Sequence, residues 1–121
     1  MPIILQRIYH ENPQSEGRRI LIDRVWPRGI SKEKAKLDDW MKEIAPSPDL
    51  RKWFDHDPKK FAALKQAYKD EIKQDALKQA KLKELRDMAR EENLTLLYGA
   101  KDEVHNHAVV LKEILESCSD L

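Results

Sequence analysis

The segment Leu94-Thr95-Leu96-Leu97-Tyr98 decides the fold, because it is a nearly continuous apolar run of strand length. A strand that is buried on both faces of a parallel sheet shows such a run, whereas a strand with one solvated face alternates apolar and polar residues. We therefore predict a central strand over residues 94–98 and expect the other elements to pack around it.

Two further strands are predicted from the N-terminal part of the chain. Residues 3–9 and 19–26 are rich in β-branched and aromatic side chains, and Pro27 and Gly29 end the second segment. Residues 11–17 between them have the composition of a turn. This connector is at the lower limit for a parallel crossover, so the sequence leaves open whether the two strands are parallel or form a hairpin.

The rest of the chain predicts helices. Ser31 can cap a short helix over residues 32–37, and Asp38 or Asp39 can begin another that runs through residues 40–44. A longer helix is expected after Asp57-Pro58, then one over residues 75–91, and a last one over residues 103–116 that Asp102 caps. Apolar residues recur at three- and four-residue steps in these segments: Phe61, Leu64, Tyr68 and Ile72, then Leu77, Leu82, Leu85, Met88 and Ala89.

Length and composition indicate one soluble α/β domain over residues 1–121, with a small, mostly parallel sheet of about three strands flanked by five or six helices. The chain holds 23 Lys and Arg against 22 Asp and Glu. No global field therefore draws it to nucleic acid, and any anion must bind locally. The single Cys118 fits a reducing compartment, and no signal peptide or apolar span is present, so we expect a cytoplasmic protein without a membrane partner.

The first candidate site is the Asp-Arg-Val-Trp-Pro-Arg-Gly segment, residues 23–29, at the carboxyl end of a predicted strand. Ligands of open α/β sheets gather at this edge, and the forked donors of Arg24 and Arg28 suit phosphate or carboxylate. A purely structural reading is equally weighted: Asp23 would pair with one arginine to hold the turn, and Trp26 would belong to the core.

The second candidate site is the loop after the central strand. A helix N-terminus favours anions, and Lys101 adds a positive charge beside the expected cap at Asp102. His105 would lie in the first helical turn as a neutral imidazole, which suits acid/base chemistry or, more simply, a structural hydrogen bond. His105 and His107 are two residues apart on a helix and diverge, so we expect no metal and no cofactor.

Several of these segments resemble the bacterial YeaO-like proteins, a family defined as a domain of unknown function. The resemblance rests on Leu-Ile-Asp-Arg-Val-Trp-Pro-Arg-Gly at residues 21–29 and on Asn106-His107-Ala108, and it extends over residues 37–40, 44–47, 50–54, 56–58 and 94–98. Longer relatives carry a Cys-His-Arg stretch where this chain has residues 106–108. The resemblance thus implies that the thiol chemistry suspected for those relatives has no thiol here, and only His107 carries over.

Three functions remain open at this stage. The preferred one is binding of a small phosphate- or nucleotide-containing anion, in which Arg24, Arg28 and Lys101 hold the charge and His105 or His107 polarises the ligand. Trp26 or Trp53 would stack on it, and Tyr98, Asp102 and Asn106 would complete the site. The alternatives are an enzyme that uses Asp23 and a histidine for acid/base chemistry, and a nucleic-acid- or protein-binding module. The sequence fixes neither the ligand nor the choice between monomer and homodimer.

Overall fold

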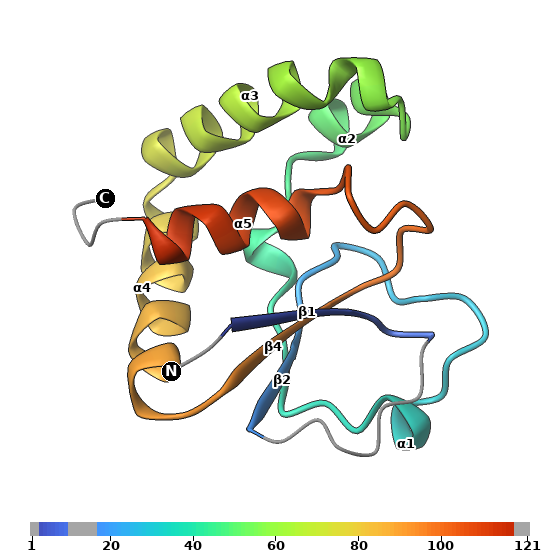
Figure 1. Cartoon of the computed structure of the whole chain (residues 1–121), viewed down its shortest axis with the longest axis vertical. Helices are drawn as coiled ribbons and strands as arrows, with labels where there is room; N and C mark the ends of the chain where they lie inside the picture. Colours follow the sequence, from blue (N-terminus) through green and yellow to red (C-terminus); the bar gives the residue numbers. More distant parts are fainter. Residues whose placement is uncertain (1–2, 10–16, 118–121) are drawn as a thin grey trace.

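The computed structural model describes residues 3–9 and 17–117. Its centre is a parallel sheet in the order β1 (Ile3–Arg7), β4 (Leu94–Tyr98), β2 (Arg18–Leu21) and β3 (Asp39–Trp40) (Figure 1). The expected small parallel sheet is confirmed. Cys118 and residues 11–16 of the expected turn lie outside the described residues.

β4 is the central strand, as the apolar run predicts. All five of its residues are buried, and Leu96 pairs with Leu5 on one side and with Ile20 on the other. The first two strands are therefore parallel to each other, but they do not pair, because β4 lies between them. The question that the connector left open is answered in favour of a parallel arrangement.

The helix expected to begin at Asp38 or Asp39 was wrong. Asp39–Trp40 is instead the edge strand β3, which pairs with Ile20 and Leu21 of β2 and is followed by the 3-10 helix η1 (Lys42–Ile44). The carboxylate of Asp38 accepts a hydrogen bond from the backbone of Arg19 across the sheet, so it does not cap a helix. Pairing with β2 outweighs a local helical preference in so short a segment.

The remaining helices follow the expected order. Ser31 caps α1 (Lys32–Ala35), Ser47 caps α2 (Pro48–Phe54), and Asp57 caps the 3-10 helix η2 (Pro58–Lys60). The long helices are α3 (Phe61–Gln74), α4 (Ala76–Glu91) and α5 (His107–Glu116). The start predicted for α5 at residue 103 was wrong. Asn106 caps this helix, since its side-chain oxygen accepts from the backbone of Val109 at 3.0 Å.

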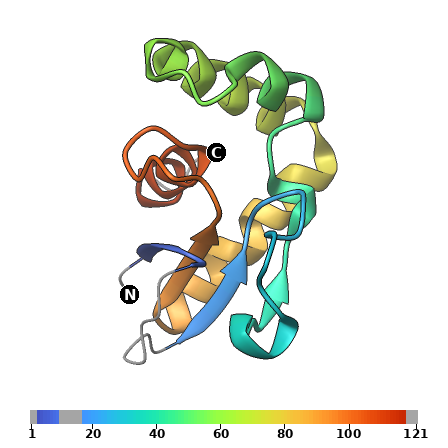
Figure 2. The same cartoon turned by 90° about the vertical axis from the view of Figure 1, so that its right-hand side faces the viewer.

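The sheet separates two apolar clusters. Leu94, Leu96 and Tyr98 face the main core under α3, α4 and α5, whereas Leu97 joins a smaller cluster on the opposite face with Leu21 and Ala35. In Figure 2, α3 and α5 lie above the sheet and α1 lies below them, beside the edge strand. Leu64, Tyr68, Ile72, Leu82 and Leu85 are buried, as the core stripes of α3 and α4 predict, but the place of Leu77 in the second stripe was wrong, because this residue is 53% exposed at the start of α4.

Among the described residues, no helix has both the length and the apolar character needed to cross a membrane.

Candidate functional site

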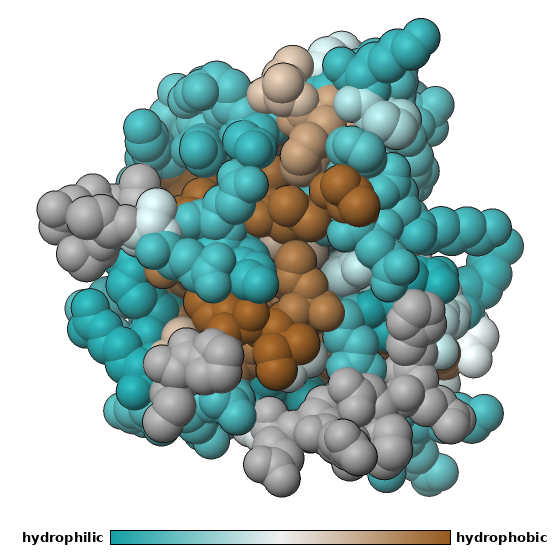
Figure 3. All heavy atoms as spheres, in the orientation of Figure 1, coloured by the Kyte–Doolittle hydropathy of each residue, from teal (hydrophilic) through white to brown (hydrophobic). Residues whose placement is uncertain are grey.

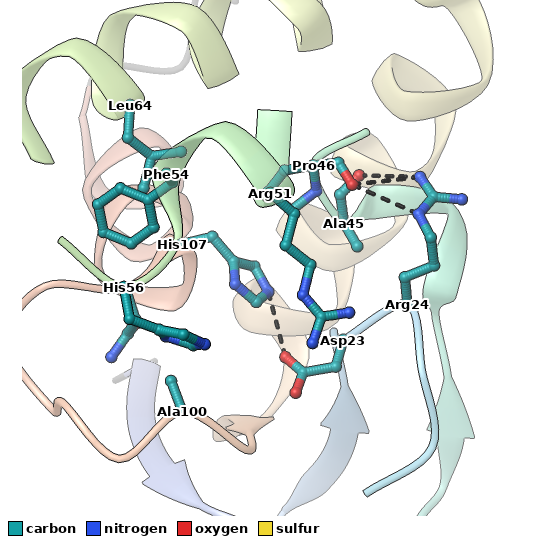
Figure 4. Close-up of a pocket in the computed structure, with 11 residues that line it drawn as sticks. Asp23, Arg24, Ala45, Pro46, Arg51, Phe54, His56, Leu64, Ala100 and His107 are labelled. Atoms are coloured by element: carbon teal, nitrogen blue, oxygen red, sulfur yellow. Dashed lines mark hydrogen bonds and ion pairs between the residues drawn. The ribbon is translucent and has the colours of Figure 1, made fainter. Parts of the chain in front are cut away.

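The carboxyl ends of β2 and β4 border a small cavity of about 60 Å³ (Figure 4). A wider cleft of about 790 Å³ adjoins it. Four residues line both hollows, namely Asp23, Arg51, His56 and Ala100. The two hollows are therefore one continuous site at the edge of the sheet where ligands of open α/β folds gather.

The two candidate segments of the sequence meet at this site. Arg24, Asn106 and His107 line the cavity together with Asp23, and the remaining cleft residues from these segments are Trp26, Arg28, Lys101 and Asp102. The segments are more than 70 residues apart in the chain, and the parallel pairing of β2 with β4 brings them together. The two candidate segments therefore lie at one edge of the sheet.

Asp23 and His107 form the polar centre of the cavity. The Nε2 atom of His107 lies 3.0 Å from the carbonyl oxygen of Ile22 and 3.3 Å from Oδ1 of Asp23. The carbonyl can only accept, so Nε2 carries a proton and donates it. The other carboxylate oxygen of Asp23 accepts from the backbone of Gly99 at 2.8 Å. This contact ties the end of β2 to the end of β4.

Arg24 and Arg51 differ in how much of their guanidinium is engaged. Arg24 donates to the carbonyl oxygens of Ala45 and Pro46 at 3.3–3.5 Å, and its side chain points away from His107 (Figure 4). The Arg51 side chain lines both hollows and extends toward Asp23. Within the described residues no hydrogen bond or ion pair holds the Arg51 side chain, so its donors remain available.

Sequence reasoning did not assign a role to Arg51. The residue sits on α2, whose start is fixed when the Glu71 carboxylate accepts from the backbone and the hydroxyl of Ser47. His56, also given only a local role by the sequence, follows the helix with a left-handed φ of 55°. The chain turns sharply there and places His56 on the wall of the site. No spacing rule in the sequence indicates that α2 reaches the sheet edge.

The loop over residues 23–30 is held by one aromatic residue of its own and by two from neighbouring parts of the chain. Trp26 donates from Nε1 to the carbonyl oxygen of Ile30 at 2.7 Å and packs edge-on against Trp40, with ring centroids 5.3 Å apart. The Tyr9 hydroxyl donates to the carbonyl oxygen of Arg28. These contacts fix the backbone of the loop and leave the Arg28 side chain at the cleft.

Three candidate residues line neither hollow. His105 is not helical: its Nδ1 lies 3.0 Å from Oδ2 of Asp102, and its ring packs edge-on against Phe61. Trp53 is 46% exposed and lies under the ammonium of Lys60. Tyr98 is buried, and burial raises the pKa of its hydroxyl.

In the loop before α5, the polar side-chain atoms of Asp102 and Asn106 are engaged in local hydrogen bonds. Asp102 accepts from the backbone of His105 and Val104, and these hydrogen bonds lower the pKa of its carboxyl. Asn106 accepts from the backbone of Val109 and donates to the carbonyl oxygen of Asp102 at 2.8 Å. In the part of the chain that the structure describes, no three His, Cys, Asp or Glu side chains could hold one metal ion.

Tyr68 packs against His107, and its buried hydroxyl makes the stability of the fold depend on pH. Its ring packs edge-on against His107, its hydroxyl donates to the carbonyl oxygen of Ile44 at 2.5 Å, and burial raises its pKa well above the usual value. The unfolded tyrosine ionises near pH 10, so the stability that this residue contributes is complete below about pH 10 and is lost as the pH rises further.

We expect Tyr68→Phe to lower the free energy of unfolding by about 1–2 kcal/mol at pH 7, because the buried Ile44 carbonyl loses its donor. Above about pH 10 the deficit should shrink, because only the wild-type chain gains from ionisation when it unfolds. Urea unfolding at pH 7, 9 and 10.5 measures both effects. A deficit that stays constant or grows over this range would contradict the assignment.

Comparison with known proteins shows the family to which the chain belongs. A family model described as the inactive DUF488-N3 subclade matches residues 2–120. The uncharacterized protein YeaO of Escherichia coli is 44% identical over 117 residues, which covers 97% of this chain and 99% of that protein. The uncharacterized proteins Rv3073c of Mycobacterium tuberculosis and Mb3100c of Mycobacterium bovis are each 33% identical over 109 residues, or 90% of this chain and 89% of theirs. No solved structure matches.

Proposed function

Since this chain belongs to the inactive DUF488-N3 subclade, we propose that it binds a small phosphate- or nucleotide-containing anion without transforming it. The ligand lies in the cleft at the carboxyl ends of β2 and β4, with its charged group toward the small cavity. The word inactive in the family description favours binding over turnover.

The charges around the site favour an anion. Its cations are Arg24, Arg28, Arg51 and Lys101, and its acids are Asp23 and Asp102. Both acids accept from backbone N–H groups, His105 contacts Asp102, and Nε2 of His107 lies 3.3 Å from Oδ1 of Asp23, an oxygen without a hydrogen-bond partner among the described residues. Local contacts thus partly offset the negative charges, and the side chains of Arg28, Arg51 and Lys101 remain to meet a ligand.

The observation that carries the proposal is the position of Arg51. Its guanidinium lies where the cavity and the cleft join, and no side chain or carbonyl of the described residues holds it. A guanidinium fork presents parallel N–H donors that match two oxygens of a phosphate or carboxylate. Arg24 plays a different part, since its donors already hold the Ala45 and Pro46 carbonyls.

The start of α5 argues against covalent chemistry. By the family resemblance, Asn106 occupies the place of a cysteine in longer relatives, and here both ends of its amide are used in hydrogen bonds that cap the helix. An amide in that state offers no nucleophile. His107 remains at the site with its Nε2 proton directed at acceptors of the chain itself.

Isothermal titration with adenosine 5′-monophosphate and with inorganic phosphate tests the proposal. Arg51→Lys should weaken binding by about fivefold or more, and Arg28→Lys should also weaken it, because an ammonium keeps the charge and loses the fork. Lys81→Ala, on the outer face of α4, is the control and should leave the affinity within about twofold. Equal affinity of Arg51→Lys and wild type would assign the arginine a structural role and remove the proposed site.

An acid/base enzyme remains the second candidate because His107 and Asp23 are only 3.3 Å apart. Incubation of the chain with the same nucleotide, followed by phosphorus NMR, distinguishes the two functions. Under the binding proposal the nucleotide is recovered unchanged. Turnover that disappears in His107→Gln would replace the binding proposal with the enzyme.

We also propose that the protein works in the cytoplasm. The single cysteine of the chain supports a reducing compartment, since it cannot form an internal disulfide. Fractionation of cells that carry an epitope-tagged chain would test this location.

A further inference from the structure

A second hollow lies far from the proposed anion site, between α3 and α4. We call it the α3–α4 groove; it has a volume of about 450 Å³. The two helices meet at Asp75, which caps α4, and Figure 1 shows them as a bent pair along one side of the molecule. None of the residues that line the groove belongs to the cavity or the cleft described above.

The walls of the α3–α4 groove are strongly basic. Five cationic side chains line it against one acid, Asp87: they are Lys69, Lys73, Lys83, Arg86 and Arg90. The whole chain has a formal net charge of only +1, so this imbalance is a local feature. The acids that alternate with these residues in the sequence, such as Asp70 and Glu84, line other surfaces.

Arg86 provides an independent sign of a missing partner. The residue as a whole is only half-buried, yet its Nε and one terminal nitrogen are enclosed and have no hydrogen-bond partner among the described residues. Enclosed guanidinium nitrogens are costly unless an acceptor meets them. Asp87, the acid in the groove, lies 3.9 Å from Arg90 instead. An acceptor from outside the chain would remove this cost once the Arg86 side chain turns toward the groove.

The residues at the floor of the groove favour a peptide over a nucleic acid as its ligand. Ala76 and Ala80 provide an exposed aliphatic base between the charged walls, Ile72 and Leu82 lie beneath with only 2% and 3% of their surface exposed, and no aromatic side chain of the described residues lines the groove. Proteins that bind single-stranded nucleic acids commonly stack the bases on aromatic side chains, which this groove does not offer. An aliphatic floor between cationic walls instead suits a segment with apolar residues on one face and carboxylates on its flanks.

We infer that the α3–α4 groove binds an acidic amphipathic peptide segment of a partner protein, with one carboxylate on the guanidinium of Arg86 turned toward the groove. The apolar side chains of that segment pack on Ala76 and Ala80, and the lysines of both helices meet its remaining carboxylates. The proposal does not depend on the anion site, because the two hollows share no residue.

Fluorescence anisotropy with a dye-labelled twelve-residue peptide tests the inference. The peptide carries leucines at helical spacing and four glutamates, and a second peptide has glutamine at each glutamate. The double variant Lys83→Gln, Arg86→Gln should bind the acidic peptide at least about tenfold more weakly than wild type. Lys34→Gln on α1 removes one exposed cation away from the groove and should bind within about twofold of wild type.

Each outcome decides for or against the inference. It is supported if the acidic peptide saturates, the glutamine peptide does not, and only the double variant loses binding while its melting temperature stays near that of the wild type. It is overturned if the wild type does not bind the acidic peptide or if the double variant binds it equally well. Tighter binding of a dye-labelled twelve-nucleotide oligouridine, abolished by the same double variant, would also overturn it and assign the groove to nucleic acid.

Discussion

Leu96→Asp is expected to lower the free energy of unfolding by about 4 kcal/mol or more, enough to unfold a domain of ordinary stability. Leu96 is fully buried and pairs with strands on both sides. A carboxylate at this position finds no partner and no water, and the apolar contacts of the leucine with the main core are lost as well. We expect Leu96→Asp to show no cooperative unfolding transition when urea denaturation is followed by circular dichroism at 25 °C.

Lys81→Asp is the comparison for this prediction. Its ammonium lies 3.3 Å from Glu84 at the surface of α4, and an exposed pair of this kind contributes little. We expect a loss of about 1 kcal/mol or less for Lys81→Asp. Similar urea midpoints for the two variants would show that β4 is not the centre of the sheet.

Gly17→Ala is expected to cost about 3 kcal/mol or more. Gly17 has a φ of 92°, and a Cβ there would overlap the backbone carbonyl of Asn93. That carbonyl accepts from Arg18 at 2.9 Å, which is the first contact between β2 and β4. A methyl group therefore has to displace the backbone at the point where the central pairing begins.

Gly29→Ala is the control for this prediction. It measures the cost of a left-handed backbone conformation without the steric overlap that a Cβ meets at Gly17. Gly29 has a similar φ of 81°, but nothing lies within 4 Å of its would-be Cβ. This variant should lose only about 1 kcal/mol, the usual cost of a left-handed alanine. Chemical denaturation of both variants measures the difference. Equal losses would mean that the Asn93 carbonyl is not in contact with Gly17.

The central strand and the core helices could be predicted because each depends on a local pattern. Residues 94–98 are apolar throughout, and the stripes of α3 and α4 repeat at helical steps, so burial follows from the sequence directly. β3 could not be predicted in this way. Its two residues carry no strand pattern, and they are extended because β2 offers an unpaired edge beside them.

The sequence could indicate only those parts of the candidate site that lie where strands end. Asp23, Arg28, Lys101 and His107 reach one edge because parallel strands end together. The role of His105 depended on a helix start at residue 103, and the cap at Asn106 moves that start to His107. Arg51 could not be predicted, because its place depends on how Glu71 of α3 holds the start of α2.

The central claim is that the cleft at the carboxyl ends of β2 and β4 binds an anion through Arg51. Titration of the isotope-labelled protein with adenosine 5′-monophosphate, followed by NMR, tests it most directly. The account predicts saturable shifts of the Arg51 Nε–H signal and of the backbone amides of Gly99 to Asp102, with the α3–α4 groove unchanged. Saturation without any change at Arg51, or shifts confined to the groove, would contradict it.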